Sequence, residues 1–249
     1  MSSICLKCRI AELDIDISVL VPQNRLIKQA DKYLFERTCS PDFKIAFNDE
    51  FLQKRANETQ GLTLSEAEYI WTGYEFCRRL LEFDGFVLHA SAVVYKNKAY
   101  LFSAPSGTGK STHTAIWEKV FGSDVVVIND DKPALRLIDG KLYVYGTPWS
   151  GKSDKNENLS ARLGGICFIS QSETNHIKKA DIVTSTALIL GQTLRYPSED
   201  FMSKLLDFLD KILPDIPVFK MECNMEDEAA IMAYEFMNKN IKGDNFYEN

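Results

Sequence analysis

The stretch LFSAPSGTGKST, residues 101–112, combines the residue types that bind phosphate. The common phosphate-binding loop reads G-x-x-x-x-G-K-S/T, and this chain keeps the final glycine, lysine and serine. Ala104 stands in place of the first glycine, which adds a methyl group and is tolerated where φ is negative. Gly107 and Gly109 still allow the tight path in which consecutive backbone N–H groups face oxyanions. The stretch therefore predicts a site for nucleotide phosphates.

The side chains at the end of this loop have separate expected tasks. Lys110 can reach the β- and γ-phosphates, and the Ser111 hydroxyl can bind Mg²⁺. The alternative is a glycine-rich turn without a ligand, but an apolar run before the loop and a helical pattern after it favour the phosphate site. We therefore expect ATP and Mg²⁺ as cofactors. The predicted nucleotide-binding residues are Ser106, Gly107, Thr108, Gly109, Lys110, Ser111 and Thr112.

Two carboxylates follow the apolar run VVVIN further along the chain. Asp130 and Asp131 come where a buried strand would end, and a metal-bound nucleotide needs a carboxylate at such a place. Adjacent residues on an extended chain point to opposite sides, so the two groups can take different tasks. The alternative is a solvated turn before Pro133. The phosphate loop upstream favours the metal site.

The elements that must position these groups alternate between strands and helices. The sequence predicts a helix from Lys110 to about Val120 that ends at Gly122, and a hairpin around the Asp139-Gly140 pair. A further helix is expected after Asn224 as its cap. The remaining predicted strands and helices cover residues 86–95, 98–104, 124–130, 134–138, 141–146, 164–171, 182–194, 199–212 and 217–222.

The region before these elements has a different pattern. Residues 1–60 alternate apolar and polar side chains and predict a small strand-rich N-terminal region. Residues 61–85 predict a connecting amphipathic helix. The main domain is then expected over residues 86–241, with a frayed tail at residues 242–249. The apolar face expected for the connecting helix consists of Ile70, Tyr74, Cys77, Leu80 and Leu81.

Residues 88–112, LHASAVVYKNKAYLFSAPSGTGKST, and the later INDD at 128–131 resemble one superfamily as an ordered set. It joins HPr kinase/phosphorylase with ATP-dependent phosphoenolpyruvate carboxykinase. Its members carry a His on the strand before the loop, a loop of the form S-G-x-G-K-S/T, and an Asp-Asp pair at the end of the next strand. The resemblance covers residues 86–170. It implies an α/β fold: a P-loop kinase core of HPr kinase/carboxykinase type, with a mixed sheet and flanking helices.

The resemblance also assigns roles to residues. It implies that His89 lies near the transferred phosphoryl group, that Ser111 and Asp130 serve the metal, and that Asp131 is the general base. With Lys110 these give the predicted catalytic set Asp131, His89 and Lys110. By sequence alone a single His in an apolar strand is more often structural, and only the linked motif favours catalysis. The other histidines, His113 and His176, lack such neighbours, and we expect both to be surface or structural residues.

Three further residues are candidates for substrate contact. The stretch YGTPWSGK, residues 145–152, resembles the turn after the hairpin in small kinase-like members, where Trp149 and Lys152 could face a substrate or phosphate. The alternative is an ordinary loop with one packed Trp. Arg195 is a cation after a predicted helix, where a surface position or an interaction with the helix dipole is the alternative.

Composition excludes several classes of partner. A net charge of −6 argues against nucleic-acid or anionic-membrane surfaces, which need clustered Lys and Arg. No segment approaches about 18 consecutive apolar residues, and the N-terminus lacks the apolar run of a secretion signal. We therefore expect a cytoplasmic protein with reduced cysteines. Cys5 and Cys8 form a C-x-x-C without a second pair, and a strand would place them on opposite faces.

These observations predict a kinase that moves the γ-phosphoryl group of ATP to a hydroxyl. The acceptor is a Ser of a protein or peptide, or a small molecule, and the oligomeric state stays open. A phosphoenolpyruvate carboxykinase would need a further metal site and a cationic pocket, and such enzymes are much longer chains. A nucleotide-binding regulatory protein without turnover is the alternative from another class. Retention of Lys110, Ser111 and both carboxylates favours the kinase.

Overall fold

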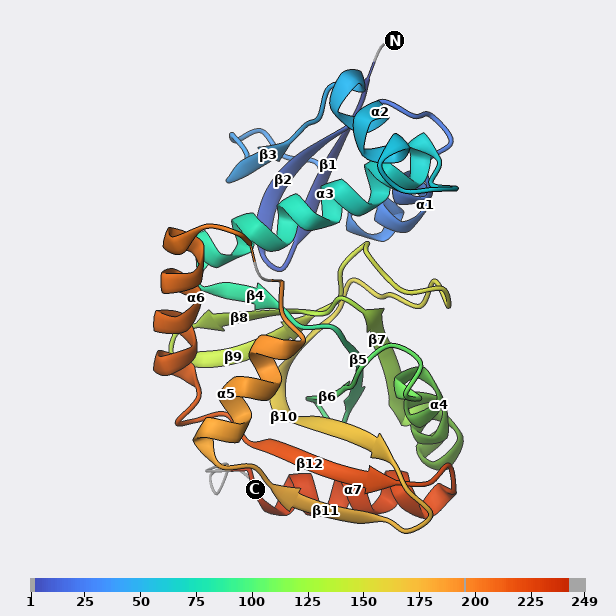
Figure 1. The fold of residues 1–249 in the computed structure, drawn as a ribbon, viewed down its shortest axis with the longest axis vertical. Coiled ribbons are helices and arrows are strands. Elements are labelled where there is room, and N and C mark those ends of the chain that lie inside the picture. The colour runs from blue at the N-terminus through green and yellow to red at the C-terminus, as the bar shows by residue number, and fades with distance from the viewer. Residues whose placement is uncertain (1–2, 195, 242–249) are drawn as a thin grey trace.

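The computed structural model describes residues 3–194 and 196–241. The expected frayed tail and Arg195 lie outside the described residues. Two sheets, one above the other in Figure 1, organise the described part of the chain. No helix among the described residues combines the length and apolar character needed to cross a membrane.

The larger sheet is mixed and curled, with flanking helices (Figure 1). Its described strands run in the order β4-β8-β9-β10-β6-β5-β7, and β12 lies beside β10 with β11 beyond it. Strand β10 pairs in parallel with β6 and β12, and the other pairs are antiparallel. The strands are β4 Gly85–Val87, β5 Ala90–Tyr95, β6 Lys98–Ser103, β7 Val125–Asp131, β8 Ala134–Ile138, β9 Lys141–Tyr145, β10 Ser160–Gln171, β11 His176–Lys179 and β12 Val218–Cys223.

Different helices cover the two faces of this sheet. Successive residues of β10 point to opposite faces, so Ile166 packs into the core beneath α5 and α6, while Cys167 packs into the core beneath α4 and α7. Trp117 of α4 is fully buried in an aromatic cluster on the second face. The helices are α4 Lys110–Phe121, α5 Ile182–Gly191, α6 Glu199–Ile212 and α7 Asp227–Lys239.

Several local predictions for this part are confirmed. Strands β8 and β9 form the expected hairpin, with positive φ at Asp139 and Gly140. Helix α4 begins at Lys110 and ends before Gly122, whose φ of 63° explains the glycine. The expected cap of the last helix is wrong: α7 begins at Asp227, and Asn224 instead accepts a hydrogen bond from the Glu226 N–H. Its side chain therefore closes a turn ahead of the helix.

The N-terminal part contains as much helix as strand. A three-stranded sheet of β1 Ile4–Ile10, β2 Leu13–Val19 and β3 Phe43–Ile45 is accompanied by α1 Arg25–Ala30 and α2 Asp49–Asn57. The prediction of a strand-rich region is therefore correct only in part, because the region also contains helices. Strand β3 ends at Ile45, because the Asn48 side chain caps α2 at the Phe51 N–H and acidic residues occupy the first turn of that helix. On β1, Cys8 is buried and Cys5 exposed, as predicted.

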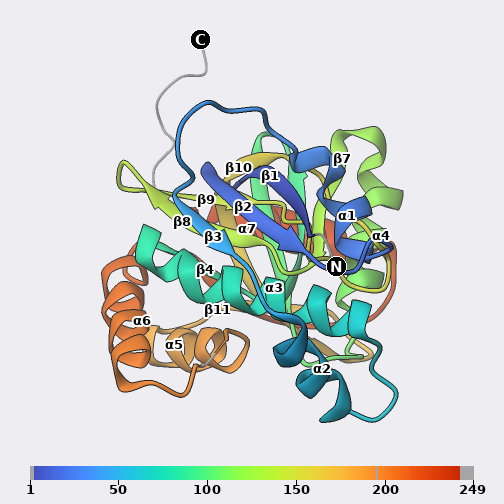
Figure 2. The same cartoon turned by 90° about the horizontal axis from the view of Figure 1, so that it is seen from above.

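Helix α3, Leu64–Leu80, lies between the two sheets within the range where a helix is expected. Figure 2 shows it crossing the molecule beside the small sheet, with α2 near its start and α6 near its end. The predicted apolar face is confirmed in part: Leu80 is buried, and Cys77 and Leu81 pack against the apolar cores. Ile70 is 51% exposed, however, and Thr72, Gly73 and Phe76 are buried as well. The helix is packed from two sides, and Thr72, Gly73 and Phe76 all contact Trp149 of the loop below it.

The N-terminal sheet and the larger sheet share one apolar core. Side chains of β1 and β2 lie in the same cluster as Val87, Ala134 and Tyr145 of the larger sheet. The Arg136 guanidinium also donates to the Ala11 carbonyl at 2.6 Å. The first part of the chain is therefore fixed on strands β4, β8 and β9 of the larger sheet.

Candidate functional site

The glycine loop, residues 104–109, connects the end of β6 to the start of α4. Gly107 and Gly109 have φ values of 81° and 113°, which residues with a side chain rarely adopt. Ala104 is not among the residues with positive φ, so its extra methyl group causes no backbone strain. Gly109 forms the N-cap of α4 without a side-chain hydrogen bond. The first N–H groups of this helix are therefore oriented toward the loop, where an anion can accept from them.

Lys110 is the first residue of α4 and is only 8% exposed. Its Nζ donates to the Ala104 carbonyl at 3.0 Å, which holds the ammonium group back along the loop. Burial lowers the pKa of Lys110, and the charges of Asp131 and Asp130 oppose that shift. The lysine thus lies within the field of both carboxylates, and a phosphate group would give its ammonium a direct partner.

Asp130 lies near the end of β7 and accepts from three hydroxyl groups. Ser111 donates to its Oδ1 at 2.9 Å, and Ser153 donates to its Oδ2 at 2.6 Å. Ser91, the cross-strand neighbour of Asp130 on β5, also donates to Oδ1. Sequence reasoning missed Ser91 and Ser153. Ser91 could be identified only from the pairing of β5 with β7, and the sequence does not indicate which residues of these strands are opposite each other.

The loop over residues 146–159 returns to β7 and carries Ser153 to Asp130. The Gly151 N–H donates to the Asp130 carbonyl at 2.8 Å, and the Asp130 N–H donates to the Lys155 carbonyl at 3.1 Å. A Cβ at Gly151 would lie 2.5 Å from the Asp130 carbonyl oxygen. Only glycine therefore permits this close approach, which fixes the position of the Ser153 hydroxyl.

Asp131 faces a different set of partners, as the alternation of an extended strand predicts. The His89 Nε2 lies 3.2 Å from its Oδ1, and the Lys132 ammonium pairs with its Oδ2. Burial raises the pKa of Asp131, but the hydrogen bond from His89 and the charge of Lys132 outweigh it and lower the pKa to about 2. On its other side, the His89 Nδ1 lies 2.9 Å from the Gln192 Oε1. Asp131 is thus an ionised carboxylate with a positioned imidazole.

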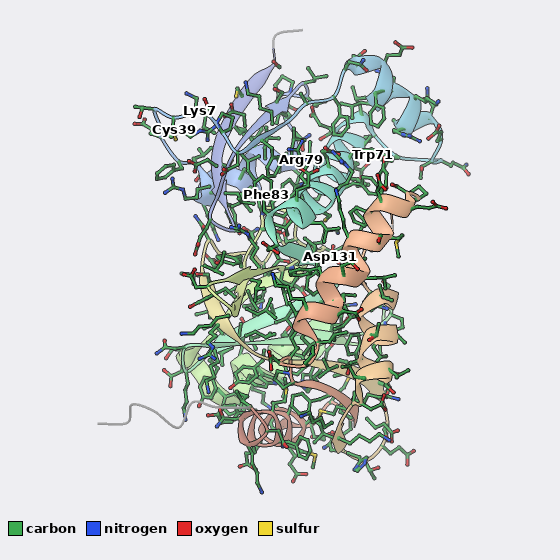
Figure 3. All side chains as sticks on the ribbon, turned by 90° about the vertical axis from the view of Figure 1, so that its left-hand side faces the viewer. Lys7, Cys39, Trp71, Arg79, Phe83 and Asp131 are labelled. Carbon is green, nitrogen blue, oxygen red and sulfur yellow. The ribbon has the colours of Figure 1, made fainter. Side chains whose placement is uncertain are left out.

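One cavity of about 750 Å³ brings these groups together. Figure 3 shows Asp131 below α3, on the side of the larger sheet. Helix α3 and the N-terminal part form the opposite wall, with Arg25, Tyr69 and Ile70 among the lining residues. The predicted site residues that line this cavity are His89, Ser106, Gly107, Lys110, Ser111, Asp130, Asp131 and Lys152.

Four predicted site residues within the described part of the chain do not line this cavity. Thr108, Gly109 and Thr112 line a separate cavity of about 20 Å³, which also borders Met225. The expectation that Trp149 faces a substrate is wrong. Its side chain is 2% exposed, stacks on Phe76 with ring centroids 4.8 Å apart, and so belongs to the core beside α3.

The remaining histidines have the surface and structural positions expected of them. His176 is exposed on β11. His113 is buried in α4, where the Trp117 indole N–H donates to its Nε2 at 3.3 Å. Burial lowers the pKa of His113 to about 4, so the ring is neutral at ordinary pH.

The oxygen atoms around Asp130 fit a Mg²⁺ ion held with nucleotide phosphates. Mg²⁺ prefers oxygen ligands and commonly uses one or two carboxylates together with substrate phosphates. The Asp130 carboxylate and the Ser111 hydroxyl provide oxygen atoms of this kind beside the glycine loop. No group of three or more His, Cys, Asp or Glu side chains that could hold a metal by itself occurs within residues 3–194 and 196–241.

Comparisons with solved structures give distant similarities. No protein-family model matches the sequence, and no curated protein matches it. The structure is similar to that of the HPr(Ser) kinase/phosphatase from Coxiella burnetii, with a TM-score of 0.34 and 12% identity. The match covers 61% of this chain and 95% of the other. This similarity is too distant to indicate an activity, so any inference about activity depends on the geometry of the site.

Proposed function

We propose that this protein transfers the γ-phosphoryl group of Mg-ATP to a hydroxyl group. One observation supports the proposal above all: a single cavity is lined by a phosphate-type loop, a carboxylate held by hydroxyls, and a second carboxylate paired with a histidine. Phosphoryl transfer depends on positioning and charge stabilisation more than on covalent chemistry. These three parts are the ones that such a reaction requires.

The nucleotide end of the cavity is the glycine loop and the start of α4. Backbone N–H groups there would bind the phosphates, and Lys110 would neutralise part of their charge. Ser111 and Asp130 would hold the Mg²⁺ ion, which supplies further charge neutralisation at the β- and γ-phosphates. Ser91 and Ser153 orient the Asp130 carboxylate for this task.

The acceptor end is the pair of Asp131 and His89. An alcohol is a poor nucleophile until a base takes its proton, and Asp131 is ionised because its pKa is lowered to about 2. His89 and Lys132 fix the carboxylate from two directions. In this proposal the hydroxyl of the acceptor hydrogen-bonds to Asp131, with its oxygen facing the γ-phosphoryl group.

Calorimetry with Mg-ATP tests the proposal. The Lys110→Met variant keeps the aliphatic stem and removes the charge, and we expect it to bind Mg-ATP at least about tenfold more weakly than the unmodified protein. The matched control is Lys178→Met, on the exposed side of β11, which should bind as the unmodified protein does. Equal affinity in Lys110→Met would contradict the proposal. Tight binding without ATP consumption in the presence of any acceptor would indicate a regulatory nucleotide-binding protein instead.

A further inference from the structure

A second cavity, of about 320 Å³, adjoins the catalytic pair. It shares Ile70, His89 and Lys132 with the cavity that holds the glycine loop. A molecule bound there would therefore lie next to His89 and Lys132, the two partners of the Asp131 carboxylate. The lining residues are Ile70, Tyr74, Cys77, Val87, His89, Lys132, Gly191, Gln192, Thr193 and Leu194.

Most of the wall of this cavity is apolar. Ile70, Tyr74 and Cys77 come from one side of α3, and Leu194 comes from the segment after α5. Burial raises the pKa of the Cys77 thiol to about 12, so this side chain is a neutral part of the wall. Ile70 is 51% exposed although it is a large apolar residue. An apolar ligand would cover surface that otherwise stays in contact with water.

The polar groups of the cavity adjoin one another beside the catalytic pair. Gln192 contacts both the His89 ring and the His89 backbone N–H, and Thr193 pairs with the residue that precedes His89. The Thr193 hydroxyl oxygen is buried and has no hydrogen-bond partner within the described part of the chain. A buried polar atom without a partner is costly, and a bound polar ligand would remove that cost.

The charge of the cavity wall indicates the charge that a complementary ligand would carry. Of the described residues that line this cavity, Lys132 is the one with a permanent charge, and its ammonium lies beside Asp131. A carboxylate on the ligand would be complementary to this ammonium and could also accept from the Thr193 hydroxyl. Asp131 itself does not line this second cavity.

We propose that the second cavity binds the phosphoryl acceptor, and that the acceptor is a small hydroxy acid with an apolar body. Its carboxylate pairs with Lys132, its apolar body packs against Ile70 and Tyr74, and its hydroxyl points to Asp131. The volume matches the lower end of small-molecule sites, roughly 300–1,000 Å³. This inference rests on the proposed function and names its substrate class.

The reaction balances with ATP as the only co-reactant. The acceptor oxygen forms a bond to the γ-phosphorus while the bond from that phosphorus to the β–γ bridging oxygen breaks. The bridging oxygen leaves with the electron pair as part of ADP, and the hydroxyl proton passes to the Asp131 carboxylate. The products are a phosphate ester, ADP and a proton that Asp131 then releases to solvent.

Binding of 3-phenyllactate without nucleotide is the direct test, because this probe joins a hydroxyl, a carboxylate and an aromatic ring. We expect calorimetry to detect binding, and Ile70→Asp and Lys132→Met each to weaken it by about tenfold or more. The control is Ile231→Asp on α7, a residue that is also exposed, at 40%, on a helix that contributes no residue to the cavity. Circular dichroism of each variant verifies that it is folded.

Phosphoryl transfer from radiolabelled ATP gives the second readout. Glycerate keeps the carboxylate but lacks the apolar body, and 3-phenylpropan-1-ol keeps the ring but lacks the carboxylate. We expect kcat/KM for each to be at least about tenfold below that for 3-phenyllactate. Equal values for all three, or an equal loss of binding in Ile231→Asp and Ile70→Asp, would overturn the assignment.

The two proposals can fail separately. If Mg-ATP binds but 3-phenyllactate neither binds nor accepts phosphate, the acceptor assignment is wrong and the nucleotide site stands. If 3-phenyllactate binds and loses affinity in the two cavity variants but Mg-ATP does not bind, the second cavity is a hydroxy-acid site and the proposed phosphotransferase function is wrong.

Discussion

The Ser111 hydroxyl donates to Asp130 Oδ1 at 2.9 Å, which joins the start of α4 to the end of β7. This contact brings one hydroxyl and one carboxylate oxygen together at the foot of the glycine loop. A Mg²⁺ ion that replaced the shared proton would have two protein oxygens beside the phosphates. Asp131 does not share this contact, because its carboxylate lies against His89 and Lys132 instead.

Asp130→Asn should raise the Mg²⁺ concentration needed for half-maximal activity. The amide keeps the shape of the carboxylate but loses the negative charge that attracts the ion. A magnesium titration of ATP consumption measures the shift, and saturating Mg²⁺ should restore much of the rate. An unchanged magnesium requirement would contradict the assignment of Asp130 to the metal.

Asp131→Asn should instead keep Mg-ATP affinity within a few-fold and lose about 100-fold or more in phosphoryl transfer. The reason is that the amide cannot take the proton of the acceptor hydroxyl. Calorimetry gives the affinity, and radiolabelled ATP with the acceptor gives the rate. If excess Mg²⁺ rescues Asp131→Asn but not Asp130→Asn, the roles of the two carboxylates are reversed.

Ser153→Ala should raise the magnesium requirement in the same direction as Asp130→Asn, by a smaller factor. The Ser153 hydroxyl donates to Asp130 Oδ2 at 2.6 Å, and its loss leaves the carboxylate less well oriented. The comparison variant is Ser160→Ala, at an exposed position in β10. If both variants shift the requirement equally, the hydrogen bond has no role in positioning the metal ligand.

His113 should make stability depend on pH in a window set by its burial. Its folded pKa is lowered from 6.5 to about 4, so between these values the unfolded chain binds a proton that the folded chain does not. Stability contributed by the neutral ring is complete above about pH 6.5 and falls by up to about 1.4 kcal/mol for each unit as pH decreases. Urea unfolding at pH 7 and pH 5 should show a weaker dependence in His113→Gln. His176→Gln, at an exposed position, should retain the original dependence.

Gly73→Ala should destabilise the fold through Trp149. A Cβ at Gly73 would lie 2.7 Å from the Trp149 Cδ1, and this buried ring cannot move without disturbing the stack on Phe76. We expect a loss of about 1–3 kcal/mol in the free energy of unfolding. Gly191→Ala in α5 meets no atom within 4 Å and should be neutral or stabilising. Equal stability of the two variants would show that the Trp149 side chain adapts to the added methyl group.

The sequence by itself determined the features that depend on neighbouring residues. The glycine loop, the helix that starts at Lys110 and the turn at Asp139 and Gly140 follow from local backbone preferences, and all three are found where they are predicted. The separation of Asp130 from Asp131 is local in the same sense, because adjacent residues of a strand face opposite sides. Their roles in catalysis remain predictions.

The tertiary structure alone decided which distant groups meet. Asp130 contacts Ser91 and Ser153, at separations of 39 and 23 residues, and His89 contacts Gln192 at a separation of 103. No local preference encodes these pairs, because they depend on strand order and on the loop that returns to β7. The prediction for Trp149 was wrong for the same reason. A tryptophan in a glycine-rich loop is expected to be exposed, but Gly73 of α3 leaves the space in which this ring is buried. The cavity beside His89 likewise exists only because α3 and the end of α5 pack on either side of it.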